Sequence, residues 1–314
     1  MSFSFENESG VSIMSCHFNS VTTHLAACAA MLLLAVCPAH SQTPSQTGPG
    51  VTATQEPIVV ILRTNAQVKS TPSVEAEVVA SVSRDTEFKV TGSTEGWVKV
   101  GIKGGGEGWL PEAEVGFKIN RGGRPCVEVS LEKALDLGAL DGAFHGTGSS
   151  SGDSVILRAK GTLTAEICPA FESGTVLENQ NAGGQNMVLT SLRGRPSGLR
   201  ITPAFELRFE PGIEAEYLFE AYCINFTKDN PGTTDRLTPK GPAADEIKKI
   251  LALKSDNLMA VQLAIWAITD NVSPHDANEK FDATTADINA ARRLMEAAGL
   301  PANRFQLFTL APPQ

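Results

Sequence analysis

Positive charge is scarce in this 314-residue sequence. Its 26 Lys and Arg residues stand against 35 Asp and Glu residues, which gives a net charge of −9. A chain without a basic excess cannot neutralise many phosphates, so the charge argues against a nucleic-acid binder. Hydrophobic residues make up 42% of the chain, which is a globular composition and excludes wholesale disorder or a collagen-like fibre. The length predicts about two domains.

Long hydrophobic runs are also missing, apart from Leu25–Val36. This run of about a dozen apolar residues is too short for a bilayer span but suits the core of a signal peptide. It ends near Ala39–Ser41, a small-x-small cleavage pattern. Residues 1–40 contain acids but no Lys or Arg, which favours Met14 as the true start. We therefore expect a signal peptide over residues 1–41 and a secreted or extracytoplasmic protein with no stable membrane span.

Removal of residues 1–41 takes three of the six cysteines with it and leaves Cys126, Cys168 and Cys223. Export permits disulfides, and an odd count leaves one cysteine over. A Cys126–Cys168 disulfide leaves Cys223 free, while a Cys168–Cys223 disulfide is equally allowed by the sequence. The odd cysteine is therefore a candidate for other chemistry.

The chain after residue 41 divides by composition. Residues 42–56 are rich in Thr, Gln, Ser, Pro and Gly and read as a linker. Residues 57–118 predict a small all-β domain, and Asn120–Pro125 reads as a joint to a larger domain over 126–310. Strand patterns followed by helix patterns predict an α+β fold overall, with an antiparallel β half and a helical half in the larger domain.

Periodicity in the larger domain predicts strands first and helices afterwards. The strands are expected at 155–159, 176–178, 187–192, 205–209 and 217–224, and the helices at 244–254, 258–269 and 285–298.

Short alternating strands over residues 57–118 carry a recurring pattern. A Ser-x-Pro-Ser turn occurs at 70–73, and two strands begin with glycine followed by Trp97 or Trp109. At these residues the segment resembles the bacterial SH3-like domain. The resemblance implies an extracytoplasmic bacterial protein whose barrel docks on cell-wall glycan or peptide, or acts as a spacer. Trp97 and Trp109 then line a ligand groove, or else they pack in the barrel core.

A second pattern pairs Cys223 with Gln262. Tyr222 precedes the cysteine at the end of a predicted strand, and Gln262 begins a Gln-x-Ala-apolar-Trp motif with Ala264 and Trp266 on a predicted helix. This combination resembles the thioester domain of bacterial surface adhesins. The resemblance implies an internal thioester between Cys223 and Gln262, surrounded by Tyr222, Ala264 and Trp266.

The chemistry of such a bond is coherent. A thiolate is a strong nucleophile, and attack on a carboxamide expels ammonia and leaves an activated acyl group. A buried thioester would then acylate an amine, such as a lysine on a surface partner. The protein would be a single-use covalent trap for adhesion or attachment, not an enzyme.

Two other functions stay open at this point. Cys223 as a buried hydrophobe or disulfide partner, with Gln262 as an ordinary helix residue, predicts a non-covalent envelope-binding or structural protein. Cys223 with His275 predicts a cell-wall cysteine peptidase, although His275 reads as a loop residue. No cofactor is expected. His145, read as a loop residue, and His275 are the only histidines after residue 41, which argues against a histidine-rich metal site.

Overall fold

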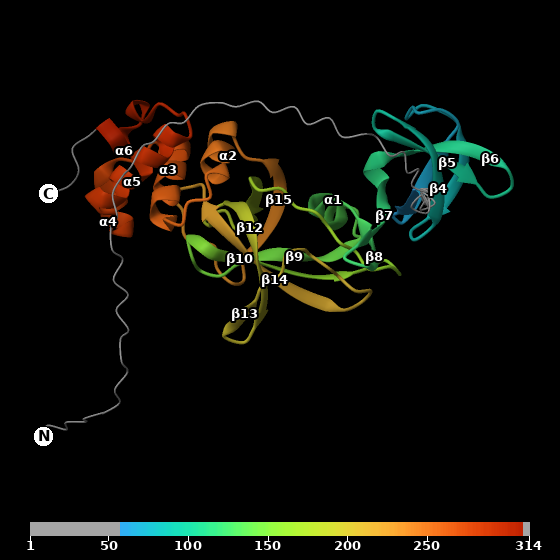
Figure 1. Cartoon of the computed structure of the whole chain (residues 1–314), viewed down its shortest axis with the longest axis horizontal. Helices are drawn as coiled ribbons and strands as arrows, with labels where there is room; N and C mark the ends of the chain where they lie inside the picture. The colour runs from blue at the N-terminus through green and yellow to red at the C-terminus, as the bar shows by residue number, and fades with distance from the viewer. Residues whose placement is uncertain (1–56, 310–314) are drawn as a thin grey trace, which may run out of the picture. The chain divides into compact units, whose positions relative to one another are not determined.

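The computed structural model describes residues 57–309 (Figure 1). The expected signal peptide, the start at Met14 and the linker over 42–56 lie outside the described residues. None of the described helices is both long enough and apolar enough to cross a membrane.

The first part of the structure is an antiparallel β domain whose strands run in the order β3-β2-β6-β5-β4-β1-β7-β8. Alternate residues of the strands face inward. Val98, Val100 and Leu110 are buried, while Lys99 and Trp109, at the alternate positions of their strands, are only half-buried. The strands are β1 (Ile58–Ile61), β2 (Asn65–Lys69), β3 (Val78–Ser83), β4 (Glu87–Thr94), β5 (Trp97–Ile102), β6 (Gly106–Pro111), β7 (Val115–Arg121) and β8 (Arg124–Glu128), with a 3-10 turn at Glu112–Glu114.

The segment expected to be an interdomain joint is instead the turn of a β-hairpin. Strands β7 and β8 pair in antiparallel register, and Gly122 and Gly123 between them have φ angles of 61° and 80°, which glycine adopts without strain. Strand β8 also carries Cys126, whose disulfide to Cys168 reaches into the next part of the chain. The glycines of the expected joint therefore form a tight turn between two paired strands.

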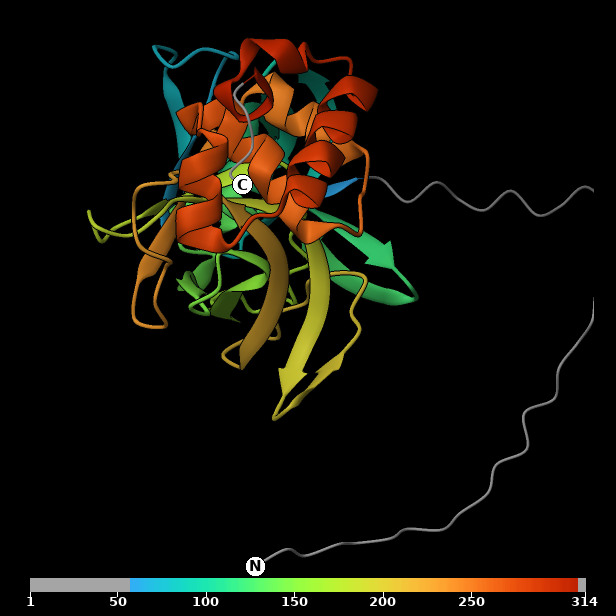
Figure 2. The ribbon, with the colours of Figure 1, turned by 90° about the vertical axis from the view of Figure 1, so that its left-hand side faces the viewer.

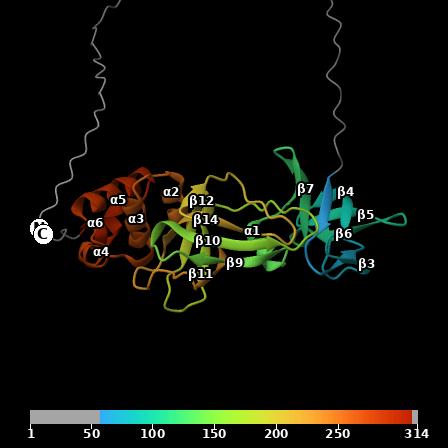
Figure 3. The same cartoon turned by 90° about the horizontal axis from the view of Figure 1, so that it is seen from below.

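The larger part is built on a second antiparallel sheet in the order β11-β15-β9-β10-β14-β12-β13. Strand β12 also pairs with β11, which closes the sheet on itself. Strand β14 lies between β10 and β12, next to both in Figures 1 and 3. The strands are β9 (Leu140–Gly146), β10 (Ser151–Gly161), β11 (Thr175–Asn179), β12 (Met187–Ser197), β13 (Arg200–Thr202), β14 (Glu214–Cys223) and β15 (Arg236–Pro242).

Helices α2 to α6 follow the sheet and gather together, as Figures 1 and 2 show, whereas α1 precedes the sheet. Residues Ala260–Ala267 of α3 are all buried, because α3 packs against α2 and α5 and also against strands β10 and β14. Asn257 caps α3 by accepting a hydrogen bond from the Ala260 amide. The helices are α1 (Leu131–Asp136), α2 (Asp245–Ala252), α3 (Leu258–Asp270), α4 (Pro274–Phe281), α5 (Thr285–Ala297) and α6 (Gln306–Thr309), with a 3-10 turn at Ala302–Arg304.

One predicted strand is wrong. Residues 205–209 form no strand; Phe209 makes only an isolated bridge to Ile167. The Tyr217 hydroxyl accepts a hydrogen bond from the Arg208 amide at 2.9 Å and donates to the Arg208 carbonyl at 2.8 Å. A side chain thus satisfies backbone groups that a neighbouring strand would otherwise pair.

Candidate functional site

Cys223 and Gln262 come together from a strand and a helix. Cys223 is the last residue of β14, and Gln262 lies in the second turn of α3. The central position of β14 in the sheet and the burial of α3 hold both residues in place. Both are enclosed, with Cys223 0% and Gln262 1% exposed. A buried carboxamide needs hydrogen-bond partners, so the partners of Gln262 define the site.

The backbone of Cys223 holds both ends of the Gln262 carboxamide. The Cys223 amide donates to Gln262 Oε1 at 3.1 Å, and Gln262 Nε2 donates to the Cys223 carbonyl oxygen at 2.7 Å. The same amide also donates to the Ser150 carbonyl oxygen at 3.0 Å. These two hydrogen bonds fix the Gln262 carboxamide against Cys223, the residue whose side chain carries the thiol.

The thiol of Cys223 lies in the buried hydrophobic core. Its Sγ is 3.4 Å from Met187 Sδ, on the neighbouring strand β12, where Met187 pairs with Cys223 in register. Burial raises the pKa of the Cys223 thiol, and the positive charge of Lys280 on α4 opposes that rise. The thiol is therefore neutral and shielded from water at ordinary pH.

The other residues of the two motifs surround the pair differently. Tyr222 points to the opposite face of β14, where its hydroxyl donates to Glu220 Oε1 at 2.9 Å, and burial together with the Glu220 charge raises its pKa. Ala264 is fully buried in α3. Trp266, also fully buried, lies edge-to-face with Phe226 at 5.2 Å and 4.3 Å from the ring of Phe281. This aromatic cluster packs helix α3 against the segment that follows Cys223.

A cleft of about 930 Å³ reaches the neighbours of the pair. Its lining includes Tyr222 and Val261, which precede Cys223 and Gln262 in the chain, and Leu258 at the start of α3. Ser191 Oγ also donates to the Glu220 carboxylate in this cleft, at 3.0 Å.

The other two cysteines of the described residues form a disulfide. Cys126 on β8 and Cys168 are joined across a sequence separation of 42, and Cys223 is the free cysteine of the described residues. The free thiol therefore belongs to the residue that contacts Gln262.

The two tryptophans of the first domain lie outside its core. Trp97 and Trp109 are half-buried and point away from the inward-facing residues of β5 and β6. Trp109 pairs across the strands with Lys99, whose Nζ lies 5.9 Å from the ring centroid. Trp97 pairs with Pro111 on the same face. This face therefore combines the two aromatic rings with an ion pair between Lys99 and Glu107.

Both histidine assignments from the sequence need correction. His275 lies in α4 and not in a loop, because Ser273 and Asp276 form a capping box and Pro274 occupies the first turn. Its side chain is 77% exposed and pairs with Glu279, whereas Cys223 is buried, so the two do not form a dyad. His145 lies in strand β9 and not in a flexible loop. The described residues contain no cluster of side chains suited to a metal ion.

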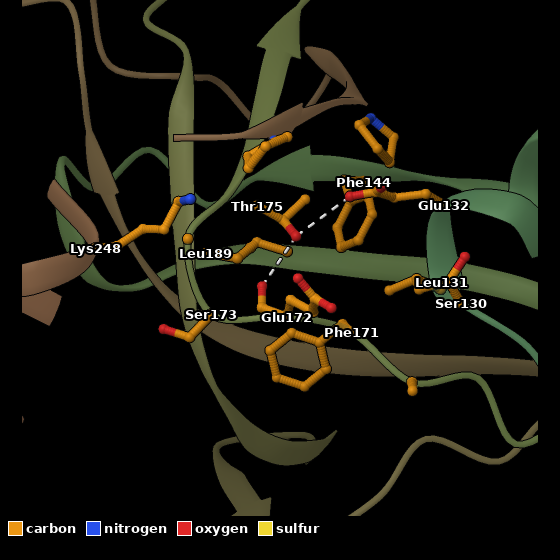
Figure 4. Close-up of a pocket in the computed structure, with 14 residues that line it drawn as sticks. Ser130, Leu131, Glu132, Phe144, Phe171, Glu172, Ser173, Thr175, Leu189 and Lys248 are labelled. Atoms are coloured by element: carbon orange, nitrogen blue, oxygen red, sulfur yellow. Dashed lines mark hydrogen bonds between the residues drawn. The ribbon is translucent and has the colours of Figure 1, made fainter. Parts of the chain in front are cut away.

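A separate cavity of about 210 Å³, which the sequence did not predict, lies between α1 and the sheet (Figure 4). Phe144, Phe171 and Leu189 form apolar walls, and Glu132 accepts a hydrogen bond from the Thr175 hydroxyl at 3.3 Å. These residues come from separate segments of the chain, so no local sequence motif predicts the cavity.

Two family models match the chain. The bacterial SH3 domain matches residues 64–115, and the thioester domain matches residues 220–298. The chain carries a bacterial SH3 domain followed by a thioester domain. The second match begins at Glu220 and contains Cys223, Gln262 and Trp266. No curated protein and no solved structure matches the chain significantly.

Both domain types are typical of surface proteins that act outside the cytoplasm. The tryptophan face lies within the SH3 match, and the Cys223–Gln262 contact lies within the thioester-domain match. Met187 and Lys280, which complete the surroundings of Cys223, carry no sequence signal that would have identified them.

Proposed function

We propose that this chain is a secreted bacterial surface protein that attaches covalently to a partner through a Cys223–Gln262 thioester. One observation carries the proposal: the Cys223 backbone binds both polar atoms of the Gln262 carboxamide, at 3.1 and 2.7 Å. Rigid placement of an amide beside a nucleophile supplies the effective concentration that this unreactive group needs. The match to the thioester domain supports the same interpretation.

Formation of the thioester starts with the sulfur of Cys223 attacking Gln262 Cδ. The developing negative charge on Oε1 meets the Cys223 amide, which already donates to that oxygen at 3.1 Å. The Cδ–Nε2 bond then breaks, the thiol proton passes to the departing nitrogen, and ammonia leaves. A single residue thereby supplies both the nucleophile and a donor for the oxyanion.

Transfer to a partner is the reverse reaction, with a lysine amine in place of ammonia. The nitrogen of a partner lysine takes the place that ammonia left, beside the Cys223 carbonyl oxygen, which accepts from Nε2 at 2.7 Å in the structure. Attack on the thioester carbon forms an amide between Gln262 and the lysine, and the thiolate of Cys223 departs and takes up a proton. The bond forms once for each molecule, because the carboxamide nitrogen is lost.

The cleft that contains Tyr222 and Val261 is lined by the residues that precede the pair in the chain, and not by Cys223 or Gln262 themselves. Because Cys223 and Gln262 are 0% and 1% exposed, bulk water is kept from the thioester, which favours survival of the bond until a partner docks. A partner amine therefore has to displace side chains that cover the pair to reach the acyl carbon.

The SH3 domain serves in this proposal as a wall-binding or spacer module. Trp97 and Trp109 present aromatic surface beside Lys99, a combination suited to cell-wall glycan or peptide. Binding of the full chain to purified peptidoglycan tests this role, and Trp97→Ala with Trp109→Ala should weaken it. Unchanged binding would leave the domain as a spacer.

Incubation of the chain with a fluorescent primary amine tests covalent attachment. The expected product is one amine per chain, located on the peptide that contains Gln262. Cys223→Ser and Gln262→Ala are matched controls that should take up no label. Absence of label in the natural chain would favour the non-covalent binding module.

A further inference from the structure

Lys280 is held as a charged group against the segment that follows Cys223. Its Nζ donates to the carbonyl oxygens of Phe226 at 2.5 Å and Lys228 at 3.1 Å. The same ammonium lies over the rings of Phe226 and Phe281, at 5.2 and 5.6 Å from their centroids. A lysine at a protein surface normally moves freely, so four contacts to one ammonium show a fixed position.

This fixed charge shares its surroundings with the thiol. Phe226 follows Cys223 by three positions, and its ring packs on Trp266 of the helix that carries Gln262. The Lys228 carbonyl also accepts from Gln185 Nε2 at 2.8 Å, and Gln185 immediately precedes the segment that leads to Met187. Lys280 thus binds the stretch of chain that follows Cys223, and Gln185 joins that stretch to the segment that leads to Met187.

The other segments packed around Cys223 bring no charge to its sulfur in the described part of the chain. Strand β12 contributes Met187, strand β10 begins beside the Ser150 carbonyl, and α3 contributes the neutral Gln262. Glu220 lies with Tyr222 on the opposite face of β14. Burial raises the pKa of Cys223, and Lys280 is the charged group that lowers it.

We propose that Lys280 is a positioning residue of the thioester, whose ammonium stabilises negative charge on the Cys223 sulfur when the bond forms and when an amine breaks it. This inference rests on the proposed function. In both steps the sulfur carries charge in the buried hydrophobic core, and a fixed cation nearby offsets that cost. The proton leaves the thiol for the departing ammonia in the first step and returns to the thiolate in the second.

Lys280 has a second conceivable role as an internal nucleophile toward Gln262. The structure favours the electrostatic role, because an amine that donates to two carbonyl oxygens and lies over two rings is bound as an ammonium. An ammonium has no lone pair with which to attack a thioester.

The test compares Lys280→Met, Lys280→Arg and Lys249→Met in the full chain. Methionine keeps the unbranched stem over the rings without the charge, arginine keeps the charge, and Lys249 is an exposed lysine on α2. The rate of methylamine addition is measured by intact mass across pH. In a Gln262→Ala background, the rate of iodoacetamide alkylation across pH is measured on the peptide that contains Cys223.

We expect Lys280→Met to slow methylamine addition by about tenfold, the effect of one lost charge contact in a partly buried site. The alkylation profile should move to higher pH, a change that loss of packing alone would not produce. Lys280→Arg and Lys249→Met should retain the natural rates and profile.

Two results would overturn the inference. One is a Lys280→Met chain with the natural rate and the natural pH profile, and the other is an amide between Lys280 and Gln262 in the natural chain. Failure of the thioester itself is distinguishable, because methylamine then adds to none of the chains while the alkylation profile still reports whether Lys280 acts on Cys223.

Discussion

The Gln262 carboxamide pairs with the backbone of Cys223 in the manner of a neighbouring strand, with one hydrogen bond in each direction. The two residues are 39 positions apart, so the contact depends on the packing of α3 against β14. The fold thus places the Gln262 carboxamide against the backbone of Cys223.

Loss of this pairing should destabilise the domain even where no thioester can form. In a Cys223→Ser background, Gln262→Ala leaves the backbone carbonyl of residue 223 without its hydrogen-bond partner. The backbone amide of residue 223 still donates to the Ser150 carbonyl oxygen. The expected cost is about 1–3 kcal/mol in the free energy of unfolding. Urea denaturation of the single and double variants measures it. Equal stability of the two would show that the hydrogen bonds contribute nothing.

The buried thiol should make stability depend on pH in a chain without the thioester. Burial raises the pKa of Cys223, so above about pH 8.5 the thiol ionises in the unfolded chain first. The stability of Gln262→Ala is therefore complete below that pH and should fall by up to about 1.4 kcal/mol per pH unit above it.

The matched control for this pH effect is Cys223→Ser with Gln262→Ala, which keeps every other titrating group. The difference between the two denaturation series isolates the thiol. Parallel curves up to pH 10 would contradict a buried neutral thiol at this position.

Trp266 should contribute through packing and not through its indole N–H. The ring is fully buried against Phe226 and Phe281, and its Nε1 has no hydrogen-bond partner among the described residues. Trp266→Ala should cost about 3–5 kcal/mol and Trp266→Phe clearly less. Chemical denaturation distinguishes them. A cost for phenylalanine as large as that for alanine would indicate a hydrogen bond that the structure lacks.

The Cys126–Cys168 disulfide should stabilise the chain where the SH3 domain ends. It closes a loop with a sequence separation of 42, and chain entropy gives about 4 kcal/mol for a loop of this length. Replacement of both cysteines by serine should lower the denaturation midpoint accordingly. An unchanged midpoint would mean that β8 and the segment around Cys168 hold together without the bond.

Much of this architecture could be predicted because its signals are local. Alternating residues around Trp97 and Trp109 predicted the first β domain, and the spacing of apolar residues in α3 predicted that helix. The motifs around Cys223 and Gln262 predicted the pair, which the fold brings into hydrogen-bond contact.

What escaped prediction depends on contacts between distant segments. The sequence of residues 205–209 predicts a strand, but the Tyr217 hydroxyl forms hydrogen bonds with both the amide and the carbonyl of Arg208. The glycines at 122 and 123 read as a joint because a hairpin turn and a flexible linker share the same composition. Lys280 lies in a polar helix without any motif, and only the folded chain brings it near Cys223.

The most direct test of the account is the intact mass of the purified chain. An internal thioester predicts a mass lower by one ammonia than the sequence requires, in addition to the loss of two hydrogens for the disulfide. Addition of methylamine should then raise the mass by one methylamine at Gln262, and Cys223→Ser should show neither change. A natural chain with its full mass and a free thiol at Cys223 would contradict the central claim.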